Sequence, residues 1–283
     1  GTYYWYGEYK KGKTILPDWA TWECYRTDVT GVGCYSSKDL LNWKFEGIVL
    51  PAVKDDPNHD LHPSKVLERP KVVYNKKTGK FVMWAHVESA DYSKACAGVA
   101  VSDSPVGPFV YQGSFRPNNA MSRDQTVFVD DDGRAYQFYS SENNETMYIS
   151  LLTDDYLKPS GRFTRNFVKE SREAPAVFKY NGKYYLSYSD NHDEGWNDGV
   201  KGDNRMRYAV SDSPLGPWES KGIYMEPTDS YTNHGSIVEF KGQWYAFYHN
   251  SALSNHDWLR SICVDKLYHN PDGTIKLVKQ TKS

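Results

Sequence analysis

Two short stretches of the sequence place an acidic residue in the same setting. The stretch "SRDQTVFVDD" carries Asp124 and the stretch "SREAPAVFKY" carries Glu173, each after Ser-Arg and before an apolar run. Two carboxyl groups in one cleft can hydrolyse a glycosidic bond when one donates a proton and the other is ionised. The Ala-Pro, Val and Phe after Glu173 form an apolar setting that would raise its pKa, whereas Asp124 follows Arg123 in a more polar setting. We therefore expect Glu173 to be the general acid and Asp124 to be the ionised residue that keeps its proton in place.

The elements that must position these acids repeat five times along the chain. A turn glycine followed by alternating aromatic residues occurs at Gly1, Gly79, Gly133, Gly182 and Gly242. Such a glycine favours a hairpin turn, and the alternation is typical of a strand. An apolar strand precedes four of the copies, and a further strand that ends at an acidic turn follows each copy.

Four strands repeated five times predict an all-β fold, a five-bladed β-propeller that forms a single domain over residues 1–283. A two-sheet sandwich is the alternative, but it would not explain five matched units. The first copy begins directly at its hairpin glycine, so we expect the first blade to lack its innermost strand. A second chain or another segment could supply that strand.

Equivalent positions on the innermost strands of a propeller converge at one end of its axis. The matched positions here are Glu68, Asp124, Glu173 and His234. The arginines beside the three acids are Arg69, Arg123 and Arg172. A purely structural interpretation is that each acid pairs with its neighbouring arginine and closes the axis. Clustered carboxylates repel one another and raise the pKa of at least one member, and such groupings tend to mark functional sites.

Composition excludes several classes of protein. The 283 residues carry a formal charge of −2, so bulk charge recruits neither nucleic acid nor an anionic membrane. Apolar runs stay well short of the roughly 20 residues that a membrane span needs. Aromatic residues make up 15% of the chain at a mean hydropathy of −0.73, which suits half-buried strands and a pocket where sugar rings stack on aromatic faces. Without an initiator Met or a signal peptide, we expect a processed or trimmed chain that is secreted or periplasmic.

The four cysteines do not have the spacing of a metal site. Cys34, Cys96 and Cys263 lie in apolar strand-like runs, so we expect buried free thiols there. A disulfide between Cys24 and Cys34 is the alternative.

The motifs in combination resemble glycoside hydrolase family 43 over nearly the whole chain. The stretches that carry the resemblance are "SRDQTVFVDDDG", "SREAPAVFKYNGKYYL" and "NHGSIVEFKGQWYAFYHN". The middle of the chain looks most like the branch with exo-β-1,3-galactanases and related arabinofuranosidases. The C-terminal part is more similar to the β-xylosidase and α-L-arabinofuranosidase branches.

This resemblance implies an inverting mechanism with Glu173 as the general acid and Asp124 as the residue that tunes its pKa. It implies that Glu68 contacts the substrate and that His234 lies near a bound calcium or other cation, although no cofactor is required. Trp196 is similar to a tryptophan of the galactanase-like branch, where it would be a platform for a sugar ring, with a plain loop anchor as the alternative. Arg260 resembles an arginine that reaches the site in some members, and we expect Arg123 beside Asp124 to contact the substrate as well.

The general base is the one catalytic group that the sequence does not name. In the family it lies on the innermost strand of the first blade, and the galactanase-like branch uses a glutamine from a later blade, where this chain reads "NHGSIVEF". The leading hypothesis is an exo-acting glycosidase that removes arabinofuranose, xylose or galactose from the side chains of plant polysaccharides. The alternative is a catalytically silent or engineered carbohydrate-binding propeller that lacks the base. A sialidase-like propeller would require six blades and S-x-D-x-G-x-x-W boxes, and the sequence has neither.

Overall fold

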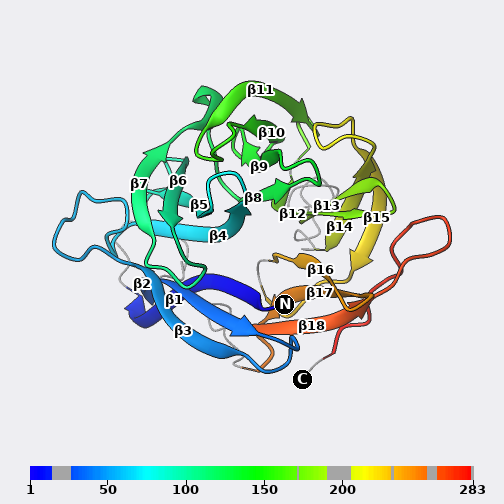
Figure 1. Ribbon diagram of the computed structural model, residues 1–283, viewed down its shortest axis with the longest axis horizontal. Helices are drawn as coiled ribbons and strands as arrows, with labels where there is room; N and C mark the ends of the chain where they lie inside the picture. Colours follow the sequence, from blue (N-terminus) through cyan, green and yellow to red (C-terminus); the bar gives the residue numbers. More distant parts are fainter. Residues whose placement is uncertain (15–26, 171, 190–204, 231–232, 254–259, 282–283) are drawn as a thin grey trace, which may run out of the picture. The chain divides into compact units, whose positions relative to one another are not determined.

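The computed structural model describes the chain except for residues 15–26, 171, 190–204, 231–232, 254–259 and 282–283. The described residues form strands and a single short 3-10 helix, η1 (Pro117–Asn119). Figure 1 labels the strands, which make five separate sheets. No helix of the described residues has the length and hydropathy to cross a membrane.

The first two sheets come from the first 115 residues. The first sheet has the order β1-β2-β3 and the second the order β4-β5-β6-β7. Their strands are β1 (Tyr3–Thr14), β2 (Thr27–Ser37), β3 (Lys44–Pro51), β4 (Val66–Asn75), β5 (Lys80–Glu88), β6 (Cys96–Ser102) and β7 (Val110–Phe115). Every pairing in these two sheets is antiparallel.

The remaining three sheets follow in chain order. The third sheet has the order β11-β10-β9-β8, the fourth β12-β13-β14-β15 and the fifth β16-β17-β18. The strands of the third sheet are β8 (Gln125–Val129), β9 (Ala135–Ser141), β10 (Thr146–Leu152) and β11 (Pro159–Asn166). Those of the fourth and fifth are β12 (Glu173–Tyr180), β13 (Lys183–Ser189), β14 (Met206–Ser211), β15 (Glu219–Met225), β16 (Ser236–Phe240), β17 (Gln243–Asn250) and β18 (Ser261–Leu267).

These sheets confirm the predicted fold class, an all-β five-bladed propeller, and among the described residues the first sheet has three strands. The predicted turn glycines 79, 133, 182 and 242 have φ between 71° and 82°, a conformation that glycine adopts at little cost. In the described residues the fifth sheet also has three strands, where the repeat predicted four. After β18 the chain instead runs against β15, where Val278 bridges Met225 and both side chains are buried in one cluster.

The chain forms two compact units. Unit 1 comprises residues 1–135 and 152–161, and unit 2 comprises residues 136–151 and 162–283. Asp124 and Glu68 belong to unit 1, and Glu173 and His234 belong to unit 2. The prediction of a single domain stays a prediction.

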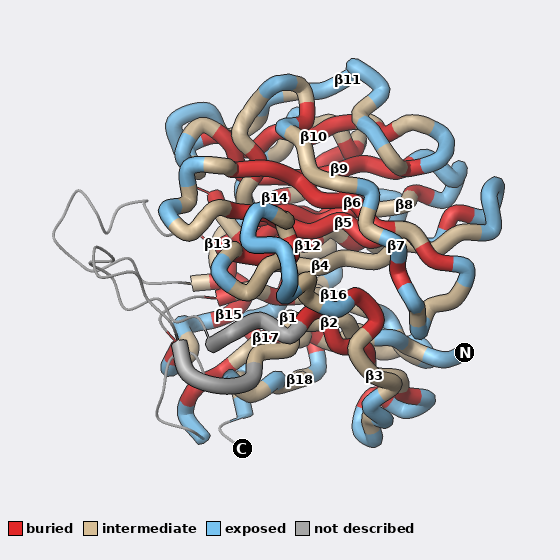
Figure 2. The backbone as a smooth tube through the Cα atoms, turned by 90° about the vertical axis from the view of Figure 1, so that its left-hand side faces the viewer, coloured by how far each residue is buried: buried red, intermediate tan, exposed pale blue. Residues whose placement is uncertain are grey.

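Buried strands and apolar clusters hold each unit together. The strands β5, β6 and β9 are buried along most of their length, as Figure 2 shows. In unit 1 one cluster includes Val32, Met83 and Phe109, and a second includes Trp84 and Val127. The thiols of Cys34 and Cys96 are free and buried, as predicted, and that of Cys263 is free and half-buried. Cys24 lies outside the described residues.

The first strands of the second and fourth sheets contain the same local irregularity. In β4 the sequence Glu68-Arg69-Pro70 shifts the register against β5, and in β12 the sequence Glu173-Ala174-Pro175 shifts it against β13. The middle residue has positive φ in both, 54° at Arg69 and 51° at Ala174. Proline has no backbone N–H for the ladder, so it suits a bulge, and a bulge re-aims the side chains beside it. An acid followed by a bulge therefore marks both strands.

We predict that Trp84→Phe destabilises unit 1 by about 1–3 kcal/mol, because Trp84 is fully buried and its Nε1 donates to the carbonyl oxygen of Tyr156 at 2.8 Å. The substitution leaves that carbonyl without its donor. Urea unfolding monitored by circular dichroism measures the change. Trp43→Phe is the matched control, since the Nε1 of the half-buried Trp43 donates to Leu40 in the same way. An equal loss in both variants would contradict the prediction.

Candidate active site

Glu68 and Asp124 come together in unit 1 from different sheets. Glu68 lies on β4 immediately before its bulge, and Asp124 lies immediately before β8. Ligand atoms of Glu68, Asp124 and His86 all lie within 4.8 Å of one another. The sequence therefore matched the positions of these two acids correctly.

Arg69 joins this cluster through the geometry of the bulge. Its Nε donates to Oδ1 of Asp124 at 2.9 Å, and the two side chains are only 18% and 11% exposed. Gln125 fixes the bulge from the next strand, because its buried Nε2 donates to the carbonyl oxygens of Arg69 at 2.7 Å and of Trp84 at 3.0 Å. The arginine next to one acid in sequence thus pairs with the acid of the neighbouring strand.

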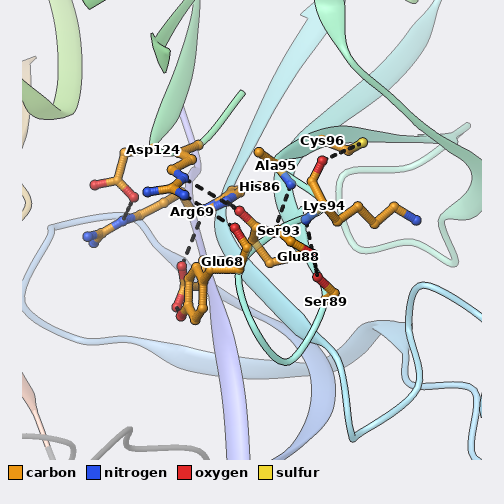
Figure 3. A network of polar contacts seen from close by, with 12 residues as sticks. Glu68, Arg69, His86, Glu88, Ser89, Ser93, Lys94, Ala95, Cys96 and Asp124 are labelled. Carbon is orange, nitrogen blue, oxygen red and sulfur yellow. Dashed lines mark hydrogen bonds and ion pairs between the residues drawn. The ribbon is translucent and has the colours of Figure 1, made fainter. Parts of the chain in front are cut away.

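A buried histidine stands behind Glu68. Figure 3 shows His86, on β5, between two carboxylates of the same network. Its Nδ1 lies 3.3 Å from Oε2 of Glu68, and its Nε2 lies 3.2 Å from Oε1 of Glu88. The Glu88 side chain is fully buried, and its Oε2 accepts the backbone N–H of Ala95 at 2.7 Å. The second sheet therefore carries an acid–histidine–acid row that ends at Glu68.

The pKa values of this row shift in the directions that the ion pairs require. Burial by itself would lower the pKa of His86, but the contacts with Glu68 and Glu88 outweigh it and raise that pKa to about 9. Burial would raise the pKa of Glu68, but His86, and after it the charge of Arg69, holds that pKa well below its usual range. Both groups are therefore charged near neutral pH.

Tyr92 and Arg123 complete the surroundings of Glu68. The Tyr92 hydroxyl donates to Oε1 of Glu68 at 2.8 Å. Arg123, expected to contact the substrate, places Nε 3.7 Å from Oε1 of Glu88 and donates from Nη2 to the carbonyl oxygen of Tyr92 at 3.2 Å. On β1, Glu8 accepts the backbone N–H of Arg69 at 3.4 Å and pairs with a lysine of its own strand. The role of Arg123 in binding stays a prediction.

In unit 2, Glu173 begins β12 and is half-buried. The Nδ2 of Asn144 donates to Oε1 of Glu173, and the carbonyl oxygen of Asn144 accepts the N–H of Arg172 at 3.2 Å. Asn144 ends a β9–β10 turn in which Glu142, Asn143 and Asn144 all have positive φ, from 52° to 72°. Non-glycine residues rarely adopt this conformation, and it tends to cluster at functional sites. The turn thus presents an amide to the predicted general acid.

Arg172 was predicted to flank Glu173, and the structure gives it further contacts. Its buried guanidinium donates to Glu170 at 2.8 Å and lies over the ring of Tyr188 at 4.8 Å. The backbone carbonyl of Arg172 accepts the hydroxyl of Ser140. Arg172 therefore anchors the start of β12 to the third sheet within unit 2.

The other predicted site residues are placed as follows. His234 is half-buried and lies just before β16, and Arg260 is exposed and lies just before β18. Trp196 lies outside the described residues. Within the described part of the chain, three side chains lie close enough together to hold a metal ion, namely Glu68, His86 and Asp124, and His234 is not among them. Because Arg69 and His86 already supply positive charge to those carboxylates, we assign them to ion pairs, and the cation near His234 stays a prediction.

Sequence reasoning missed several polar residues around the two acids, namely His86, Glu88, Tyr92 and Asn144. A signal for the first two exists in "VMWAHVE", where His86 and Glu88 alternate on one face of an otherwise apolar strand. The "ERP" and "EAP" triplets are a second signal, because proline after an acid in a strand indicates a bulge. Tyr92 and Asn144 lie in loops without such a signal.

Comparison with known proteins identifies the class of protein. The family model of glycosyl hydrolases family 43 matches residues 17–275. The chain therefore belongs to glycosyl hydrolases family 43, a family of glycoside hydrolases.

The individual relatives are of two kinds, enzymes that act on β-1,3-galactose linkages and a β-xylosidase. A β-1,3-galactosidase of family 43, solved with galactodeoxynojirimycin, is 32% identical at a TM-score of 0.83, over 100% of this chain and 92% of that chain. An exo-β-1,3-galactanase from Phanerochaete chrysosporium, solved with galactose, is 30% identical at a TM-score of 0.80, over 98% of this chain and 60% of that chain. A β-xylosidase from Xylanibacter ruminicola is 34% identical over 64% of this chain and 66% of its own length. The chain thus spans about two thirds of that curated relative.

We predict that Arg69→Met destabilises the protein by about 3–5 kcal/mol, because it leaves the buried Asp124 carboxylate without its cation. Lys77→Met is the control, since its ion pair with Asp154 has side chains that are 69% and 82% exposed, and such pairs contribute about 0–1 kcal/mol. Denaturant unfolding at pH 7 measures both changes. Equal losses would show that the Arg69–Asp124 pair is no more important to stability than a surface pair.

The raised pKa of His86 predicts a pH-dependent contribution to stability. In the unfolded chain a histidine has a pKa near 6.5, so the contribution is complete below pH 6.5 and disappears as the pH rises through about 9. Because the pKa of Glu68 is depressed, Glu68 loses its charge only at strongly acid pH, and the stabilising ion pair with His86 is lost there. The melting temperature of wild type minus that of His86→Gln should therefore be largest near pH 6 and shrink toward pH 9.

His269→Gln is the control of opposite sign for this measurement. His269 stacks on Tyr180 with ring centroids 3.7 Å apart, and burial lowers its pKa to about 4. Its contribution should be present above pH 6.5 and decline as the pH falls toward 4. The same pH trend in both variants would refute the assignment of charge to His86.

Proposed function

We propose that the chain is an exo-acting, inverting glycoside hydrolase that removes terminal sugars from the side chains of plant polysaccharides. In this proposal Glu173 donates a proton to the leaving oxygen, and Asp124 is the residue that tunes the pKa of Glu173. The observation that carries this proposal is the ion pair of Asp124 with Arg69 beside Glu68, on the frame of a family of glycoside hydrolases. Glycoside hydrolysis requires one ionised carboxylate besides the general acid, and the buried guanidinium of Arg69 keeps Asp124 ionised.

Glu173, held by Asn144, is the general acid of the proposed reaction. In the proposed reaction Glu173, which is half-buried, must donate a proton to the leaving oxygen. The amide of Asn144 donates to one carboxyl oxygen, Oε1, and so restricts the direction in which the carboxyl group of Glu173 points. A general acid requires this arrangement, because the donated proton must point in one direction.

A terminal β-1,3-linked galactose is the substrate we propose first. Its support is the likeness of the whole chain to the β-1,3-galactosidase and to the exo-β-1,3-galactanase that was solved with galactose. Xylose and arabinofuranose are the second candidates, favoured by the β-xylosidase of Xylanibacter ruminicola and by a xylosidase/arabinosidase of Bacteroides ovatus, 31% identical over 70% of this chain. Because such polysaccharides lie outside cells, we propose that the protein is secreted or periplasmic.

We predict that Glu173→Gln lowers kcat on β-1,3-galactobiose by about 10²–10⁴-fold, because the amide cannot donate the proton that the sugar leaving group needs. The loss should be smaller on p-nitrophenyl β-galactoside, whose leaving group departs without full protonation. Parallel assays with p-nitrophenyl β-xyloside and α-L-arabinofuranoside identify the sugar. Proton NMR of the first product reports whether the anomeric configuration is inverted.

Glu219→Gln is the matched control, since Glu219 is exposed on β15 and pairs with Lys221. Its activity should equal that of wild type. Equal activity of Glu173→Gln and wild type on the disaccharide would remove Glu173 as the acid. Sugar binding by wild type without turnover of any of these substrates would instead support the silent carbohydrate-binding propeller.

A further inference from the structure

We propose that His86 is a positioning residue that stays protonated and holds the carboxylate of Glu68 in place for sugar binding. The inference rests on the proposed function, in which Glu68 contacts the sugar. It concerns a side chain that would not touch the substrate and would act only through Glu68.

The contacts of the imidazole carry the first step of the argument. Each ring nitrogen faces a carboxylate oxygen, Oε2 of Glu68 at 3.3 Å and Oε1 of Glu88 at 3.2 Å. A carboxylate accepts hydrogen bonds, and a neutral imidazole carries a proton on one nitrogen only. A neutral His86 that donates from Nε2 to Glu88 would therefore set the lone pair of Nδ1 against the carboxylate of Glu68, whereas the imidazolium hydrogen-bonds Glu88 and forms an ion pair with Glu68.

Charge balance around the cluster carries the second step. The charged groups around His86 lie on β1, on β4, on β5 and in the segment before β8. Tyr92 faces them from the segment after β5. The charged groups are the anions Glu8, Glu68, Glu88 and Asp124 and the cations Lys10, Arg69 and Arg123. Among the described residues named here, four carboxylates thus stand beside three permanent cations. A protonated His86 adds a fourth positive charge to this largely buried group.

Burial makes this charge effective. His86 is 2% exposed, and Glu88 is fully buried. Solvent screens charges poorly at such depth, so an ion pair there has a larger effect than one at the surface. The same direction follows for the pKa of His86, which the two carboxylates raise to about 9 against the effect of burial.

The consequence for Glu68 is that both of its carboxylate oxygens are held. Oε2 faces His86, and Oε1 accepts the hydroxyl of Tyr92 at 2.8 Å. The remaining lone pairs can accept hydrogen bonds from sugar hydroxyls in a fixed direction, which is what a specific polar contact in a sugar site requires. Loss of the His86 proton would release Oε2 and let the carboxylate turn away.

The test measures the protonation of His86 directly. In proton–carbon NMR of the full chain labelled at the histidine ring carbons, the His86 signal is assigned by its absence in His86→Gln. Its titration midpoint should lie near pH 9, and that of His269 in the same spectrum should lie near pH 4. A midpoint for His86 at or below 6.5 would overturn the proposal, whatever the protein's activity.

The second measurement connects this charge to the sugar. Calorimetry of D-galactose, D-xylose and L-arabinose binding is carried out between pH 6 and 10 in a Glu173→Gln background, where turnover does not interfere. Affinity should fall about tenfold as the pH rises through 9, because one charge-assisted contact is lost. Glu88→Gln removes one of the two carboxylates on His86, so it should move this fall about one pH unit or more toward neutral.

The outcomes separate the two proposals. Sugar binding with a pH dependence that Glu88→Gln leaves unchanged refutes the role of His86 and leaves the proposed function standing. Failure of all three sugars to bind, together with no turnover by wild type, refutes the proposed function and the positioning role with it. His269→Gln should leave both the affinity and its pH dependence unchanged.

Discussion

The candidate site in unit 1 depends on the neutralisation of carboxylates that would otherwise repel one another. Glu68 and Asp124 lie side by side in a largely buried place, and Arg69 and His86 supply the compensating positive charge. Removal of either cation would leave a buried charge unpaired, which costs far more than the loss of a surface pair. The position of each acid is therefore inseparable from that of its cation.

The bulge in β4 is the local structure that makes this arrangement work. Arg69 would extend along a regular strand, but its positive φ and the following proline turn its side chain toward Asp124. Gln125 then closes the ladder gap by donating to the freed carbonyl of Arg69. Glu173 has the same device in unit 2, with Ala174 in the left-handed position before proline. One local solution, an acid followed by a bulge, thus serves two different roles.

The polar residues that contact Glu68 bear on how proteins of one family, with one fold, can act on different sugars. The relatives of this chain include β-1,3-galactosidases and β-xylosidases on a common fold. A shared fold does not determine specificity, which depends on the direction and charge of individual side chains. In the proposed function, the row of Glu88, His86 and Glu68 sets the direction and charge of one contact with the sugar.

The sequence by itself determined the five repeats, the all-β propeller, the family and the proximity of Glu68 to Asp124, and the matched position of Glu173 stays a prediction. These follow from period-2 alternation, turn glycines and repeated motifs, which are local patterns that survive without knowledge of contacts. Only the tertiary structure decided that Arg69 pairs with Asp124 across strands, that His86 lies between two carboxylates and that the Asn144 turn reaches Glu173. It also showed that the chain after β18 joins β15 instead of adding a fourth strand to the fifth sheet. Arg69 and Asp124 are 55 residues apart and Asn144 and Glu173 are 29 apart, and a bulge re-aims a side chain locally, so no linear pattern records which of these residues pair.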